Sequence, residues 1–169
     1  MKLYFARHGE SEANVQKIFW DQPHGYGLTD RGREQAQALA DSLAGVEFAA
    51  LYCSPILRAA QTAQIVGRRL NLTPEIEDGL RERDVGILYG QEISPENLSL
   101  CYRITQQWMV YGNRDVRFEG GESYNDIAAR FMPFIGRLEA IYRDIDASVL
   151  LIRSSSSPSS VAILALGPR

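Results

Sequence analysis

"LYFARHGESEAN", residues 3–14, sets a short apolar run directly against Arg7, His8 and Gly9. The run predicts a buried strand over residues 2–7, and the glycine indicates a turn where that strand ends. The chain has two histidines, and this one stands between an arginine and the turn. Such a position is unusual for a purely structural histidine, so His8 is the first candidate for chemistry.

The remaining chain alternates strand-like runs with amphipathic helices. The run "SVLLI" is apolar along its whole length, as expected for a parallel sheet covered on both faces. Ser54 is predicted to cap a helix whose first residue is Pro55. This alternation predicts a three-layer α/β/α sandwich with a mostly parallel central sheet, in one domain over 1–169. Further strands are expected at 48–54, 74–77 and 148–152, and helices over about 29–43, 54–70, 94–111 and 123–142.

The composition of the chain argues against nucleic acid and membranes as binding partners. The net charge of −3 gives the chain no general attraction to nucleic acid or to an anionic membrane. No apolar run approaches the length of a membrane span, and the first residues turn polar too soon for a signal peptide. Cys53 and Cys101 lack the spacing of a zinc site or a redox pair. A cytoplasmic protein with reduced, buried thiols is therefore expected.

Ligands of such sheets bind beyond the carboxyl ends of the strands. This rule selects residues 7–9, residues 54–58 and the serine run at 154–160. Two of these segments carry an arginine, and a guanidinium can bind a phosphate with two hydrogen bonds. The sequence therefore predicts a phosphate site with His8 at its centre.

Five segments in order resemble the motifs of the histidine phosphatase superfamily, the phosphoglycerate-mutase-like proteins. The segments are "RHGES" at 7–11, "LTDRG" at 28–32, "SPILRAAQTA" at 54–63, "LRERDVG" at 80–86 and "GGES" at 120–123. The resemblance covers residues 1 to about 152. It implies a phosphohistidine mechanism that needs no metal or other cofactor.

The resemblance implies a role for each matching residue. His8 would be the nucleophile, Arg7 and Arg58 the phosphate clamp, and the Asn14 amide a further donor. Neighbouring positive charges lower the pKa of a histidine and so keep it neutral and nucleophilic. Glu82 would protonate the leaving oxygen and later deprotonate water. It stands in a run of alternating charges and is preferred to its neighbours mainly by its place in the family pattern.

The pattern departs from the family after the last core strand. Relatives carry a second histidine there, in a Ser-His-Gly-like turn, and its place falls near Ser154 in this chain. Arg153 cannot replace it, because neighbouring strand residues point to opposite faces. We expect the C-terminal segment to be altered or truncated from residue 153. The apolar "VAILAL" at 161–166 predicts that the chain then returns to the core.

The sequence therefore favours a phosphomonoester phosphatase acting on a small phosphorylated metabolite, with activity impaired by the missing histidine. A non-catalytic module that binds a phosphorylated ligand is the alternative, and a phosphoglycerate mutase is the third. Residues 92–121 are expected to form a lid, and His24 to be a loop histidine near the mouth of the site. Substrate identity and oligomeric state stay open.

Overall fold

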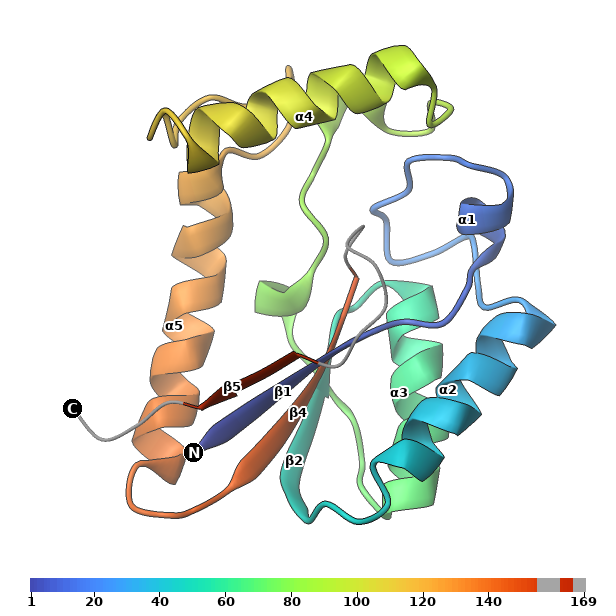
Figure 1. The fold of residues 1–169 in the computed structure, drawn as a ribbon, viewed down its shortest axis with the longest axis vertical. Helices are drawn as coiled ribbons and strands as arrows, with labels where there is room; N and C mark the ends of the chain where they lie inside the picture. The colour runs from blue at the N-terminus through green and yellow to red at the C-terminus, as the bar shows by residue number, and fades with distance from the viewer. Residues whose placement is uncertain (155–161, 166–169) are drawn as a thin grey trace.

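The computed structural model describes residues 1–154 and 162–165, which form a five-stranded sheet flanked by helices (Figure 1). The strand order is β3-β2-β4-β1-β5. The first four strands in this order run parallel, and β5 pairs antiparallel with β1. The strands are β1 (Lys2–Arg7), β2 (Phe48–Cys53), β3 (Glu75–Ile76), β4 (Ser148–Arg153) and β5 (Ala162–Ala165).

Helices cover both faces of the sheet, which confirms the predicted three-layer α/β/α architecture. In Figure 1, α2 and α3 lie on one side of the strands, α5 lies on the other, and α4 crosses above them. The helices are α1 (Glu12–Val15), α2 (Asp30–Ser42), α3 (Leu57–Leu70), α4 (Pro95–Met109) and α5 (Tyr124–Tyr142), with short 3-10 turns η1 (Asp78–Leu80) and η2 (Gly86–Leu88).

Alternate residues of the central strand β4 supply the two main cores. Leu150 and Ile152 pack toward α2 and α3. Val149 and Leu151 pack toward α5, with Phe134. Burial of both strand faces explains why "SVLLI" is apolar throughout. A third cluster joins α4 to η2 and to the segment between α4 and α5, and it includes Trp108.

The start of α3 corrects one prediction. The helix begins at Leu57, with Ile56 as N-cap, and not at Ser54–Pro55. The Ser54 amide donates to the Ile152 carbonyl over 3.0 Å, so it continues the ladder between β2 and β4. Sheet pairing therefore outweighs the local capping signal of the Ser-Pro pair.

Other boundaries differ less. Helix α4 ends at Met109, two residues before the predicted end at Tyr111. Residues Ala162–Ala165 return to the sheet as an edge strand rather than as a core element. Most of the serine run and the last four residues lie outside the described residues. Cys53 and Cys101 are free and buried, as predicted. Among the described helices, none combines the length and apolar character needed to cross a bilayer.

Candidate active site

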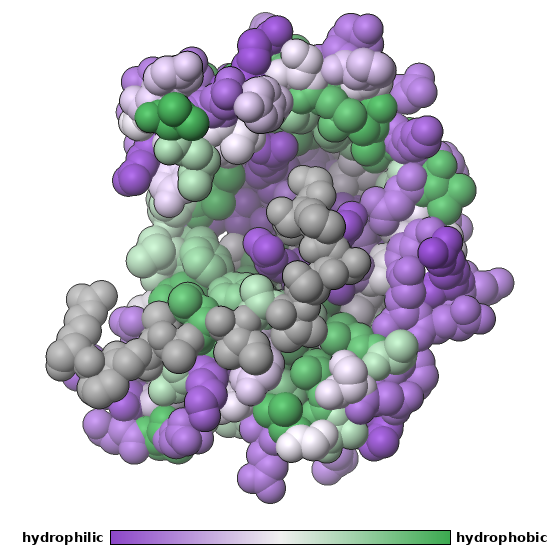
Figure 2. All heavy atoms as spheres, viewed as in Figure 1, coloured by the Kyte–Doolittle hydropathy of each residue, from purple (hydrophilic) through white to green (hydrophobic). Residues whose placement is uncertain are grey.

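Strand order brings the predicted site residues to one edge of the sheet. Arg7, at the end of β1, is paired in register with Arg153, at the end of β4. The residues that follow these strand ends are His8 and Ser154. Figure 2 shows a hollow on this face of the molecule, beneath α4, with hydrophilic residues in its visible part.

All five predicted site residues line one cavity of about 90 Å³. They are Arg7, His8, Asn14, Arg58 and Glu82. They come from β1, the turn after it, α1, α3 and the loop after η1. The structure thus brings together residues that are up to 75 positions apart in the sequence.

The turn after β1 is held against two helices. The Gly9 amide donates to Thr62 Oγ1 of α3 over 3.2 Å. A Cβ atom at Gly9 would lie 2.2 Å from the Gly32 carbonyl oxygen of α2, so only glycine fits this approach. On the other side of the turn, Ser11 and Asn14 form a capping box that starts α1.

The hydrogen bonds of His8 define its tautomer. The ring is 7% exposed, and Nδ1 lies 2.6 Å from the Gly9 carbonyl oxygen. Because a carbonyl only accepts, Nδ1 carries the proton and Nε2 carries the lone pair. That lone pair accepts a hydrogen bond from Arg58 Nε over 3.0 Å. Nε2 is therefore the ring atom of His8 whose lone pair is able to attack an electrophile.

The surroundings keep His8 neutral. Burial, followed by the positive charge of Arg58, lowers the pKa of His8 from 6.5 to about 3. The charge of Arg7 acts in the same direction. The pKa of His8 is therefore lowered, as the sequence predicted. Burial contributes more to this shift than the neighbouring arginines, on which the prediction was based.

Arg58 lies in the first turn of α3 and connects several parts of the site. Its Nη2 donates to the Trp20 carbonyl over 2.9 Å and to Ser154 Oγ over 2.7 Å. Its Nη1 is buried and has no hydrogen-bond partner among the residues that the structure describes. Such a donor is costly unless an acceptor reaches it, so the guanidinium is suited to an anionic ligand.

Ser154 occupies the position where the sequence predicts the missing histidine. Its side chain is buried and links two site residues. Its oxygen accepts from Arg58, and its hydroxyl acts on the Glu82 carboxyl by lowering its pKa, against the larger effect of burial. Arg153 is exposed, with its guanidinium 5.9 Å from the centre of the Phe5 ring. The alternation of side chains at the end of β4 therefore agrees with the prediction from the sequence.

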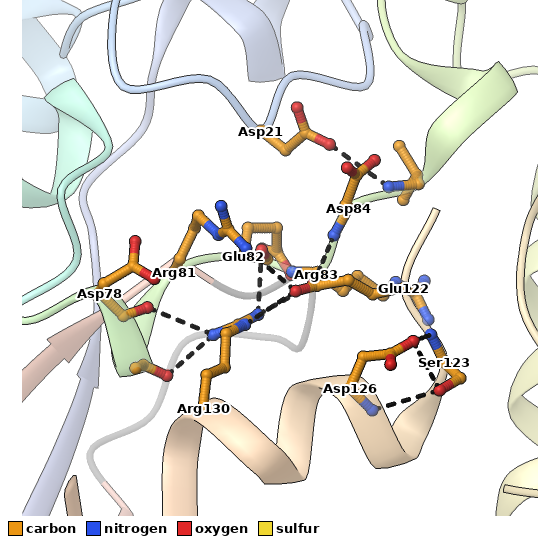
Figure 3. A network of polar contacts seen from close by, with 12 residues as sticks. Asp21, Asp78, Arg81, Glu82, Arg83, Asp84, Glu122, Ser123, Asp126 and Arg130 are labelled. Atoms are coloured by element: carbon orange, nitrogen blue, oxygen red, sulfur yellow. Dashed lines mark hydrogen bonds and ion pairs between the residues drawn. The ribbon is translucent and has the colours of Figure 1, made fainter. Parts of the chain in front are cut away.

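Glu82 is placed by a network of charged groups (Figure 3). Arg130 reaches from α5 and donates to the Glu82 carbonyl over 3.3 Å and to both carboxylate oxygens of Glu122. Glu122 in turn accepts from the Asp84 amide over 2.9 Å. The backbone is thus held at the Glu82 carbonyl and again two residues later, at the Asp84 amide. Burial raises the pKa of the Glu82 carboxyl, which favours the protonated form that an acid needs.

Asp21 is a site residue that the sequence did not predict. It is 5% exposed, lines the same cavity as His8, and accepts from the Val85 amide over 3.3 Å. Burial raises the pKa of this carboxyl. It lies in an irregular loop, and no spacing in the sequence distinguishes it from neighbouring polar residues.

Two predicted residues take peripheral positions. Asn14 is exposed, and its side-chain oxygen is used by Ser11, which leaves its NH₂ group as the end that can donate to a ligand. His24 is an exposed loop residue whose carbonyl accepts from Trp20 Nε1 over 2.6 Å. Within the described residues, no group of three or more histidine, cysteine or acidic side chains could hold a metal ion.

Comparison with known proteins identifies the family. The model of the histidine phosphatase superfamily, branch 1, matches residues 3–163. The chain belongs to this superfamily. The relatives of the chain include both phosphatases and mutases.

Three relatives show this range. A 2,3-bisphosphoglycerate-dependent phosphoglycerate mutase from Azorhizobium caulinodans is 32% identical over 78% of this chain, which spans 65% of that protein's length. A mycobacterial glucosyl-3-phosphoglycerate phosphatase, solved in complex with VO3, is 27% identical, with a TM-score of 0.73 over 90% of this chain and 75% of that one. The alpha-ribazole phosphatase from Shigella flexneri is 27% identical, with a TM-score of 0.69 over 90% and 74%.

Proposed function

We propose that this protein is a metal-independent phosphomonoester phosphatase that acts through a phosphohistidine at His8. The observation that carries the proposal is the neutral imidazole, with its proton on Nδ1 and its lone pair on Nε2, in a cavity shared with two arginines. A neutral nitrogen can attack phosphorus, whereas an imidazolium cannot.

Binding of the substrate phosphate prepares the nucleophile. Arg58 Nε donates to His8 Nε2, and this hydrogen bond occupies the attacking lone pair. A phosphate oxygen is a stronger acceptor for a guanidinium than an imidazole nitrogen is. The incoming phosphate would therefore take over the Arg58 donors and free Nε2. Arg7, Arg58 and the Asn14 amide would then stabilise the charge on the transferring group.

The reaction has two balanced steps. In the first, the Nε2 lone pair forms a bond to phosphorus, the bond to the leaving oxygen breaks, and that oxygen takes the Glu82 proton. In the second, water attacks phosphorus and gives a proton to the Glu82 carboxylate, while the nitrogen–phosphorus bond breaks and its electrons return to Nε2. Glu82 thus ends the cycle protonated, as it began.

Ser154 favours a second candidate, a phosphate-binding protein without turnover. The serine hydroxyl lies between Arg58 and Glu82, at the place where the sequence resemblance implies a second histidine. A hydroxyl donates a weaker hydrogen bond to a phosphate than a charged imidazole does. Reduced activity is therefore part of the proposal, and its complete loss would leave a binding module.

Turnover and binding separate these candidates. The protein is incubated with 4-nitrophenyl phosphate, and release of nitrophenol is followed alongside calorimetric binding of inorganic phosphate. We expect slow release that His8→Gln abolishes. Binding of phosphate without any release would contradict the phosphatase and support the binding module. Interconversion of phosphoglycerate isomers without release of inorganic phosphate would instead support a mutase.

A further inference from the structure

A second cavity, of about 410 Å³, adjoins the one that holds His8. It is lined by residues 79–83, by the ends of β1 and β4 and by part of α5. Glu82 and Arg83 line both cavities. The proposed general acid therefore stands where the two cavities meet.

Arginines dominate the lining of this second cavity. Among the described lining residues, four are arginines and the only acidic side chain is that of Glu82. The four are Arg81, Arg83, Arg130 and Arg153. Because the chain as a whole carries a net charge of −3, this positive surface is local and not a consequence of composition.

Two of the arginines form ion pairs with Glu122, which is not among the lining residues of the cavity. Arg81 Nη2 and Arg130 Nε each lie 3.0 Å from Glu122 Oε1. Even so, Arg81 Nε is buried and has no hydrogen-bond partner within the described part of the chain. This wall of the cavity therefore keeps an unused donor.

The other two arginines carry no ion pair among the described residues. The Arg83 guanidinium lies 5.3 Å from the centre of the Phe118 ring and is half-buried. Arg153 lies over Phe5 and is exposed. A ring face holds a guanidinium in place without neutralising it, so both groups keep their positive charge for a ligand.

The position of the acid determines what enters this cavity. The leaving oxygen must lie next to Glu82 to receive its proton, so the rest of the leaving group extends from Glu82 into the cavity beyond it. We propose that this cavity binds a second anionic group, a carboxylate or a phosphate, on the leaving-group side of the substrate, with Arg83 and Arg153 as its main ligands. This inference rests on the proposed function, which places the reacting phosphate at His8.

Matched compounds test the inference. Three phosphate esters share a three-carbon chain and differ at its far end: 3-hydroxypropyl phosphate, 3-phosphonooxypropanoate and propane-1,3-diol bisphosphate. Their dissociation constants are measured by calorimetry and their turnover by phosphate release. We expect at least one of the two compounds with a second anion to bind tenfold or more tightly than the alcohol. The carboxylate and the bisphosphate together show which anion is preferred.

Substitutions of single arginines test which side chains cause the preference for a second anionic group. Arg153→Gln is expected to reduce that preference to below threefold while leaving the affinity for the alcohol within twofold. Arg143→Gln removes one exposed positive charge beyond the end of α5 and should keep the full preference. Arg83→Lys tests the second ligand, because it retains the charge but loses the two-pronged geometry.

The outcomes distinguish this inference from the proposed function. Equal binding of all three compounds, or a preference unchanged in both Arg153→Gln and Arg83→Lys, would overturn the second site even if all three were hydrolysed. A preference that depends on Arg153 in a protein without turnover would support the second site and contradict the phosphatase. Failure of all three to bind would overturn both.

Discussion

The state of a single imidazole decides whether this site can perform phosphoryl transfer. His8 is buried, donates from Nδ1 to its neighbouring carbonyl, and is approached at Nε2 by Arg58. Two features of the fold thus cooperate, because the carbonyl selects the tautomer and burial selects the neutral form. Because burial disfavours the charged imidazole, protonation of His8 destabilises the folded chain.

Stability is therefore expected to depend on pH through His8. Its pKa is about 3 in the folded chain and 6.5 in the unfolded one, so between these values the unfolded chain binds the extra proton. The free energy of unfolding falls as the pH decreases, by up to about 1.4 kcal/mol per pH unit. Urea unfolding at pH 6.5 and 5 should show wild type losing up to about 2 kcal/mol relative to His8→Gln. A difference that is constant with pH would contradict the buried neutral ring.

Ser154 offers a test of the missing donor. Ser154→His places an imidazole between Arg58 and Glu82, where the sequence resemblance implies a second histidine. Single donors to a developing anion contribute about 10²–10³ in rate, so we expect turnover of 4-nitrophenyl phosphate to rise at least tenfold. Ser154→Ala, which removes the hydroxyl, is the control and should not be faster than wild type. A folded Ser154→His protein with unchanged turnover would show that the second histidine is not what limits this site.

At the scale of elements, the active-site turn depends on close backbone packing against α2. A Cβ atom at Gly32 would lie 2.0 Å from the Glu10 carbonyl oxygen. Gly32→Ala is therefore expected to reduce the free energy of unfolding by more than about 2 kcal/mol, as overpacked sites do. A Cβ atom at Gly136, in the middle of α5, would meet no atom of another element within 4 Å, so Gly136→Ala should stabilise by about 0.5–1 kcal/mol. Urea unfolding of both variants checks this contrast, and equal effects would contradict it.

Helix α5 contacts Glu82, the proposed acid, through one arginine. Arg130 and Glu122 are each 14% exposed, so Arg130→Met leaves a largely buried carboxylate with Arg81 as its remaining ion-pair partner, at a cost of about 1.5–3 kcal/mol. Turnover should fall because the Glu82 carbonyl loses its donor, whereas binding of inorganic phosphate should change little.

Arg137, on the same helix, provides the matched control. It forms a more exposed ion pair with Glu77, and such pairs contribute about 0–1 kcal/mol. Thermal unfolding and phosphate release are measured for Arg130→Met and Arg137→Met together. A loss of turnover that is the same in both variants would show that Arg130 does not position Glu82.

Local signals predicted most elements but not every boundary. Thr29, Ser94 and Ser123 each cap a helix as their sequence context indicates. Ser54 is also a favourable N-cap residue, but its amide donates to the Ile152 carbonyl of β4 instead. Helix α3 therefore begins three residues later, at Leu57. Capping is a local property, whereas strand pairing depends on β4, which lies almost 100 residues away in the chain.

At the scale of the molecule, the site follows from strand order. With β4 between β1 and β2, the strand ends bring His8, Arg58 and Ser154 to one edge of the sheet. The motifs predicted these residues because each follows a strand of the sheet, His8 and Ser154 directly and Arg58 in the first turn of the next helix. They could not predict Asp21, which depends on how its loop packs against the loop that contains Val85. They could not predict the arginine-lined cavity either, because it depends on how residues 79–83 pack against α5 and β4.

Covalent transfer of phosphate to His8 is the step on which the proposed function depends most. The direct measurement is a rapid-quench reaction with ³²P-labelled phosphomonoester, stopped in alkali and followed by peptide mapping, because phosphohistidine survives base and is lost in acid. We predict acid-labile label on the peptide that contains His8, present in His24→Gln and absent in His8→Gln. Label that persists in His8→Gln, or turnover without any label on wild type, would contradict the proposed mechanism.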